Sequence, residues 1–132
     1  METSIERISD CRAAERVLHD NLTGLDHEEV WVLFLTCDKR VITKELVSMG
    51  TLSQTSIDKR TVIKRALMNN AYGIVLFHNH PSGNPNPSVK DIQFTAGLKD
   101  ACNLMDIQLL DHIILTDGSF FSFSADRTFN RK

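Results

Sequence analysis

The 132-residue sequence lacks several features that would assign it to a specialised class of protein. Its three cysteines, Cys11, Cys37 and Cys102, are scattered and form no C-x-x-C pair, which argues against a disulfide framework and favours reduced thiols. No apolar run is long enough to span a bilayer, and the N-terminus has no basic segment followed by an apolar one. We therefore expect a cytoplasmic protein with no membrane partner.

The sequence also lacks an excess of positive charge. Its 15 lysine and arginine residues are outnumbered by 17 aspartate and glutamate residues, and the formal net charge is −2. Domains that bind nucleic acid usually carry a basic face, so we expect no direct binding to DNA.

Apolar patterns predict a mixture of helices and strands. Helices are expected from Ser9 to Leu22, from Asp58 up to Gly73, and from Ser88 to about Leu104. The apolar runs "VWVLFL" and "IVLF" predict buried strands, the first of them paired in a hairpin with "VITKELVSM". Asp117-Gly118 predicts a second hairpin. Without a repeat or linker, residues 1–132 are expected to form a single α/β (α+β) domain, with a mixed sheet flanked by helices.

The segment "FHNHPSGNPNPSVKD" contains all three prolines of the chain, directly after the strand "IVLF". His78 and His80 are two residues apart on that strand and therefore point to one side. A catalytic zinc site takes three protein ligands, and Asp91, one turn inside the next helix, supplies a carboxylate that reaches back to the histidines. The residues alone therefore predict a metal site formed by His78, His80 and Asp91. As an alternative, the histidines are ordinary polar groups at a strand end, and Ser88-x-x-Asp91 is a capping box.

A metal-activated water also needs a carboxylate that accepts its proton. The pattern favours a glutamate at the end of a rigid strand, beside the strand that carries the histidines. The residues alone leave open Glu28 and Glu29, the pair at the entrance of "VWVLFL", and Glu45 in the following strand. For the pair, an ordinary solvated strand entrance is an equally good explanation. The glutamates of the chain are Glu2, Glu6, Glu15, Glu28, Glu29 and Glu45.

Asp111 and His112 lie within the apolar run "LLDHIIL". A histidine in such a strand is usually a core residue, or one that hydrogen-bonds the second nitrogen of a metal ligand or a backbone group. We do not expect His112 to bind a metal itself.

The spacing H-x-H-P, six residues, then S-x-x-D resembles the JAMM motif of MPN-domain zinc peptidases. Over roughly residues 5–124 the chain looks like the RadC branch of that group, on "EEVWVLFLTCDKRVITKELVSMGTLSQTSID", "GIVLFHNHPSGNPNPSVKDI" and "LLDHIILTDGSFFSF". The resemblance implies the three-layer MPN fold, similar to that of cytidine deaminases, and a zinc ion (Zn2+) on His78, His80 and Asp91. It further implies that Ser88 supports the oxyanion and that Glu28 is the catalytic glutamate, with Glu29 one register away.

These features predict a zinc metallopeptidase-type hydrolase that cleaves a peptide or isopeptide bond in a peptide or protein substrate. Longer RadC-like proteins carry an N-terminal helix-hairpin-helix segment, and we expect none in this chain. The alternative is a non-enzymatic accessory or binding module associated with DNA repair. A third possibility is a zinc-loaded fold without activity, if no glutamate reaches the water. Exposed strand edges would allow a homodimer.

Overall fold

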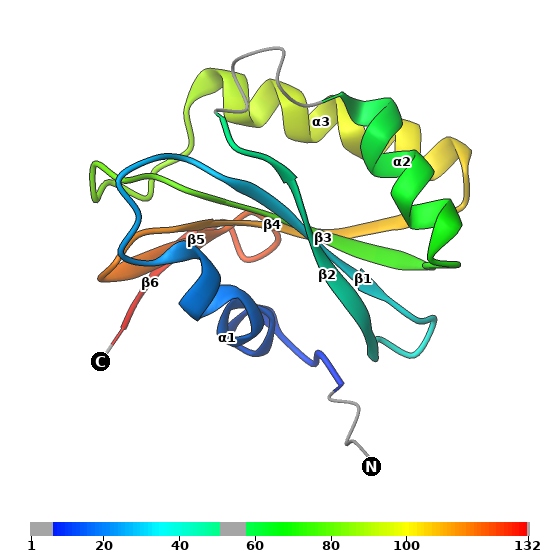
Figure 1. The fold of residues 1–132 in the computed structure, drawn as a ribbon, viewed down its shortest axis with the longest axis horizontal. Helices are drawn as coiled ribbons and strands as arrows, with labels where there is room; N and C mark the ends of the chain where they lie inside the picture. The colour runs from blue at the N-terminus through cyan, green and yellow to red at the C-terminus, as the bar shows by residue number, and fades with distance from the viewer. Residues whose placement is uncertain (1–6, 51–57, 132) are drawn as a thin grey trace.

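The computed structural model describes residues 7–50 and 58–131, which form one six-stranded mixed sheet with helices on both faces (Figure 1). The helices are α1 (Cys11–Leu22), α2 (Lys59–Met68) and α3 (Val89–Leu104). The strands are β1 (Val30–Leu35), β2 (Val41–Ser48), β3 (Gly73–Asn79), β4 (Gln108–Leu115), β5 (Ser119–Ser122) and β6 (Arg127–Asn130). Their order in the sheet is β2-β1-β3-β4-β5-β6. The predicted fold class, a mixed sheet flanked by helices, is confirmed.

The core is divided by the sheet into two apolar layers. Leu18 of α1 packs with Leu33 and Phe77 on one face, whereas Leu98 of α3 packs with Leu76 on the other. Because side chains alternate along a strand, the neighbours in β3 point to opposite faces and both are buried. This double burial explains why the central strands read as unbroken apolar runs.

One end of the sheet gathers three segments that are far apart in the sequence. β3 and β4 are parallel, so the chain crosses over between them through α3, which begins at the end where β3 finishes. β1 runs antiparallel to β3, with Val30 opposite His78. The start of β1, the end of β3 and the first turn of α3 therefore meet at this end of the sheet.

Three details differ from the sequence prediction. The first helix, α1, begins at Cys11 instead of Ser9, because the Asp10 carboxylate accepts the Ala13 backbone N–H and caps it. α2 ends at Met68, and Gly73 is the first residue of β3 instead of the end of the helix. The strand β6 was not predicted, since its four residues include only one buried side chain and carry no alternating apolar pattern.

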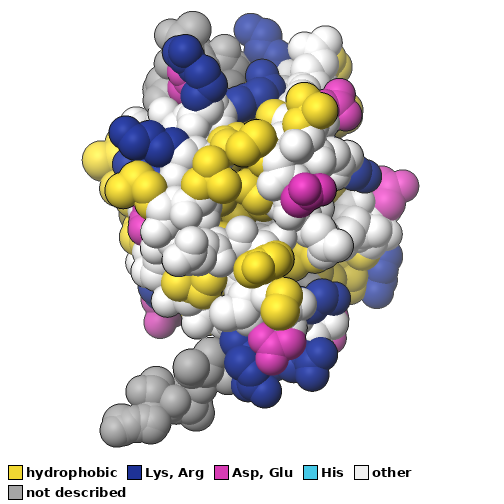
Figure 2. Space-filling view, turned by 90° about the vertical axis from the view of Figure 1, so that its right-hand side faces the viewer, with side chains coloured by type: hydrophobic (Ala, Val, Ile, Leu, Met, Phe, Trp, Pro, Cys, Tyr) yellow, Lys and Arg dark blue, Asp and Glu magenta, His cyan; other side chains and the backbone are white. Residues whose placement is uncertain are grey.

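The C-terminal end of α3 lies away from the end of the sheet where β3 finishes. Figure 2 shows apolar side chains gathered on the side of the molecule where α2 and α3 end, and the exposed ones include Leu67, Met68, Leu104 and Met105. Leu104 lies thirteen positions after Asp91 in the helix, about 20 Å along the axis, so this apolar surface is remote from the histidines. Among the described residues, no helix combines the length and apolarity that crossing a membrane requires.

The two leucines of α3 provide a direct test of this packing. Leu98 is fully buried against the sheet, whereas Leu104 is 85% exposed. We expect Leu98→Ala to lower the free energy of unfolding by about 2–5 kcal/mol, because it leaves a cavity under the helix. The same substitution at Leu104 should change it by less than about 0.5 kcal/mol. Urea denaturation followed by circular dichroism measures both, and equal effects would contradict the placement of α3.

Candidate metal centre

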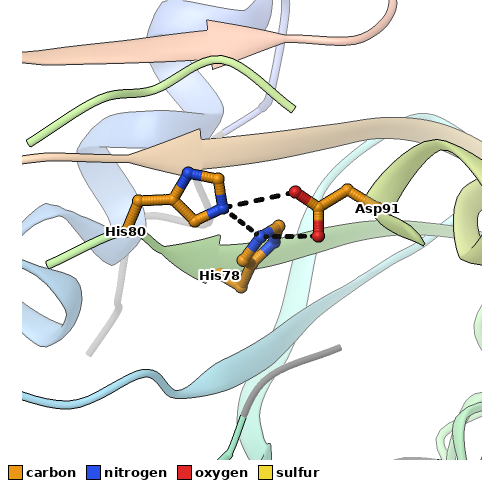
Figure 3. A group of neighbouring side chains, drawn as sticks. All are labelled: His78, His80 and Asp91. Atoms are coloured by element: carbon orange, nitrogen blue, oxygen red, sulfur yellow. Dashed lines mark hydrogen bonds and ion pairs between the residues drawn. The ribbon is translucent and has the colours of Figure 1, made fainter. Parts of the chain in front are cut away.

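Two imidazoles and one carboxylate converge where β3 ends and α3 begins (Figure 3). The Nε2 atoms of His78 and His80 are 3.0 Å apart. Each also lies 3.3 Å from an oxygen of Asp91, His78 from Oδ1 and His80 from Oδ2. His78 and Asp91 are buried, while His80 is partly exposed, so the cluster is open to solvent on the side of His80.

The spacing of these atoms fits a small tetrahedral metal ion. Zinc binds nitrogen and oxygen ligands at about 2.0–2.2 Å, which puts two ligands of a tetrahedron about 3.3 Å apart. The separations of 3.0 and 3.3 Å in the cluster are close to that value. The sequence prediction that these three side chains come together is therefore met in the structure, with donors of the kinds that zinc prefers.

The capping box and the cluster share one residue, Asp91. The Ser88 hydroxyl accepts the Asp91 backbone N–H at 3.0 Å, and Asp91 Oδ2 accepts the Ser88 backbone N–H at 2.9 Å. Asp91 therefore begins the helix and faces the histidines at the same time. The Ser88 hydroxyl uses a lone pair in this bond, so its O–H can still act as a donor.

The proline-containing loop after β3 folds back on His80. Nδ1 of His80 donates to the backbone carbonyl of Asn84, 2.9 Å away. Gly83 adopts φ +91°, which a side chain would disfavour, and its N–H donates to the His80 carbonyl. Since a carbonyl only accepts, the proton of neutral His80 is on Nδ1, and Nε2 presents a lone pair to the cluster.

Burial and the shared carboxylate perturb the three groups in different directions. Burial lowers the pKa of His78 in spite of its contact with Asp91. Burial alone would also lower the pKa of His80, but its bonds to Asp91 and to the Asn84 carbonyl outweigh burial and raise it. Burial would raise the pKa of Asp91, and the two histidines outweigh it, so the pKa of Asp91 lies well below its usual range. The carboxylate is thus ionised at neutral pH.

His112 lies behind His78 on β4. Its Nε2 is 2.8 Å from Nδ1 of His78, and its Nδ1 is 2.6 Å from the hydroxyl of Thr95 on α3. Burial holds the pKa of His112 well below its ordinary value, so the ring is neutral. Of the roles that the sequence left open for His112, the structure shows a buried residue that bonds the second nitrogen of a candidate ligand.

The three candidate glutamates have different surroundings. The Glu29 carboxylate accepts from Trp31 Nε1 at 2.9 Å and lies 2.7 Å from His27 Nε2, which directs it away from the cluster. The Glu45 carboxylate lies against α2, where Asn69 donates to it. The negative charge of Glu28, in contrast, acts on both His78 and His80 and favours their protonated forms.

The sheet register favours Glu28 over its neighbour as the glutamate on the side of the cluster. Val30 is paired with His78 and shares its face. Glu28 lies two residues before Val30, just ahead of β1, so strand alternation carried back would put it on that face as well. Glu2 and Glu6 lie outside the described residues, and Glu15 bonds His19 and Arg131 on the α1 side.

Asn79, the residue between the two histidines, was not predicted to have a role. Its Oδ1 accepts the Glu29 backbone N–H at 2.8 Å, and its Nδ2 donates to the His27 carbonyl at 2.9 Å. One amide side chain thus holds the backbone on both sides of Glu28. An asparagine between two histidines, directly after an apolar run that predicts a buried strand, is the sequence signal that could have identified it.

Comparison with known proteins finds the model of the RadC-like JAB domain matching residues 8–129. A UPF0758 protein of Flavobacterium johnsoniae is 39% identical over 125 residues, covering 95% of this chain and 55% of that protein. A UPF0758 protein of Porphyromonas gingivalis is 42% identical over 122 residues, covering 92% and 54%. The UPF0758 protein YeeS of Escherichia coli is 43% identical over 113 residues, covering 86% and 76%. The chain thus spans about half the length of the first two relatives.

We predict that Asn79→Ala destabilises the protein, because two backbone groups beside Glu28 lose their partner at a buried position. The free energy of unfolding should fall by about 1–3 kcal/mol in urea denaturation. Asn79→Asp should be no better tolerated, since a carboxylate beside the His27 carbonyl has no proton to donate. Asn103→Ala, at an exposed position of α3, is the control. If the free energy of unfolding of Asn79→Ala is within about 0.5 kcal/mol of that of the parent, the Asn79 side chain does not clamp the backbone on both sides of Glu28.

Proposed function

The chain belongs to the RadC-like JAB domain family, and from this premise we propose that it is a zinc-dependent hydrolase that cleaves a peptide or isopeptide bond. The observation that carries the proposal is the convergence of His78 Nε2, His80 Nε2 and the Asp91 carboxylate at separations suited to one tetrahedral ion. Three protein ligands leave a fourth position for water or substrate, which is the pattern of catalytic rather than structural zinc sites.

The side chains around the cluster have distinct roles in this proposal. His78, His80 and Asp91 hold the metal, and a bound zinc ion supplies Lewis-acid chemistry that polarises a carbonyl and makes water more acidic. Glu28 accepts a proton from the water that attacks the carbonyl carbon. The C–N bond then breaks, and Glu28 returns the proton to the departing amine nitrogen.

Ser88 completes the arrangement on the helix side. Its hydroxyl stands at the N-terminus of α3, exposed and next to Asp91, with its O–H available as a donor. We assign it the support of the carbonyl oxygen as that atom gains negative charge, helped by the positive end of the helix dipole. Water and substrate would enter on the side of His80, where the cluster is partly exposed.

Metal analysis tests the proposed site. Protein purified without a histidine tag and supplemented with zinc should contain about one zinc per chain. His78→Ala, His80→Ala and Asp91→Asn should each lower zinc affinity by more than the roughly 10- to 100-fold that outer hydrogen-bond partners contribute. Asparagine at 91 keeps an oxygen for the helix cap and removes only the charge. His19→Ala, on α1, is the matched control. Absence of zinc from the parent, or zinc retained after loss of both histidines, would overturn the site.

Peptide cleavage tests the proposed role of Glu28. Zinc-loaded protein incubated with a peptide library that includes an isopeptide-linked peptide should give fragments detectable by mass spectrometry. Glu28→Gln should keep its zinc and lose about 10²- to 10⁴-fold in rate, because the general base is removed. Glu29→Gln changes the adjacent carboxylate, which faces Trp31 and His27, and should stay within a few-fold of the parent. Equal losses in the two variants would contradict the assignment, and no cleavage by the zinc-loaded parent would contradict the enzymatic role.

A further inference from the structure

A line of short hydrogen bonds runs from His78 to the backbone of α3. His78 Nδ1 is 2.8 Å from His112 Nε2, and His112 Nδ1 is 2.6 Å from the Thr95 hydroxyl oxygen. That hydroxyl donates to the backbone carbonyl of Asp91, 2.7 Å away and four residues earlier in the helix. Both histidines are fully buried, and Thr95 is partly exposed.

The carbonyl at the end of the line fixes the direction of every bond in it. A carbonyl oxygen has no proton, so Thr95 gives its single hydroxyl proton to Asp91. Thr95 then accepts from His112, whose proton is on Nδ1. A neutral imidazole has only one N–H, so His112 Nε2 is an acceptor, and the proton between the two rings belongs to His78 Nδ1.

From this accounting we propose that His112 and Thr95 are positioning residues that hold the proton of His78 on Nδ1 and leave Nε2 free to bind the metal. The inference rests on the proposed function, because it concerns the same cluster. Neither residue touches the metal. Their effect is to select one of the two neutral forms of a ligand and to fix the plane of its ring.

The opposite proton arrangement conflicts with the geometry. If His78 carried its proton on Nε2, His112 would have to donate from its own Nε2, and its Nδ1 would need the Thr95 proton. The Thr95 oxygen and the Asp91 carbonyl would then face each other at 2.7 Å with no hydrogen between them. The helix backbone therefore disfavours the form of His78 that cannot bind a metal through Nε2.

The same line also connects two ligands. The carbonyl at its end belongs to Asp91, whose side chain faces the cluster, so the orientation of His78 is tied to the first turn of α3. His80 is fixed by a separate bond from its Nδ1 to the Asn84 carbonyl. Each histidine is thus directed by a line of bonds that ends on a backbone carbonyl, and each presents Nε2.

Metal binding by threonine variants tests the inference. Thr95→Val keeps the shape and removes the hydroxyl, and we expect it to weaken cobalt and zinc affinity by about 10- to 100-fold. Thr95→Ser keeps the hydroxyl, so its metal affinity should stay within about 3-fold of that of the parent. Removal of an outer hydrogen-bond partner, in contrast, lowers metal affinity by about 10- to 100-fold. Thr23→Val, at the C-cap of α1, is the matched control, because Thr23 makes the same hydroxyl-to-carbonyl bond four residues back, to His19. The absorbance of bound cobalt measures the affinity of each variant for cobalt. Displacement of cobalt by zinc then measures its affinity for zinc.

A double-mutant cycle distinguishes one connected line from two independent effects. His112→Phe keeps an aromatic ring in place, where His112 stacks on Phe123 with ring centroids 4.5 Å apart, and removes the acceptor for His78. The double variant should bind cobalt about as weakly as His112→Phe alone, because Thr95 acts only through His112. Additive losses in affinity, or affinity unchanged in Thr95→Val, would overturn the inference.

Nitrogen-15 NMR of the metal-free protein reads the proton positions directly. We expect protonated Nδ1 and unprotonated Nε2 in His78 and His112, and loss of this pattern at His112 in Thr95→Val. Protonated Nε2 in His78 would overturn the inference. If the parent shows the expected pattern and binds no metal, the proton arrangement stands and the proposed function fails. If the parent binds metal and the threonine variants bind it equally well, the proposed function stands and the positioning role fails.

Discussion

The site depends on a carboxylate in the first turn of α3 meeting two imidazoles at the end of β3. The parallel pairing of β3 with β4 makes that meeting possible, because the crossover helix has to begin where β3 finishes. The positive end of the helix dipole then favours the charge of Asp91. The capping box holds the same carboxylate from the backbone side, so the start of the helix and the geometry of the cluster are set by one residue.

Polar groups so close to a sheet buried on both faces would be costly if they lacked partners. His78, Asn79 and His112 lie on the two central strands and are almost completely buried. Within residues 7–50 and 58–131, the Ser48 hydroxyl is the one buried side-chain polar atom without a hydrogen-bond partner. The polar residues near the end of β3 therefore form connected hydrogen-bond networks, in which the removal of one member leaves another without a partner.

The sequence was sufficient for features that depend on local spacing. His78 and His80 are two residues apart and so point to one side, and Asp91 is one turn inside the next helix. This local spacing brings the three side chains together as expected. Local spacing left Glu28 and Glu29 equivalent, because what favours one of them is the register of β1 against β3. The clamp by Asn79 joins residues about 50 positions apart, and β6 is too short to give a pattern. Long-range pairing is the information that a single sequence does not contain.

The neutrality of His112 has a chemical consequence for the proposed metal. Metal-bound histidines often donate their second N–H to a carboxylate, which makes the ligand richer in electrons. Asp111, the nearest carboxylate in sequence, points to the other face, where it accepts from Ser122 and Ser124. His78 instead donates to a neutral ring, so a divalent ion held by two neutral imidazoles and one carboxylate keeps one net positive charge. Because this charge would lie at a largely buried position, where electrostatic effects are stronger than in water, the line through His112 would preserve the Lewis acidity on which the proposed hydrolysis depends.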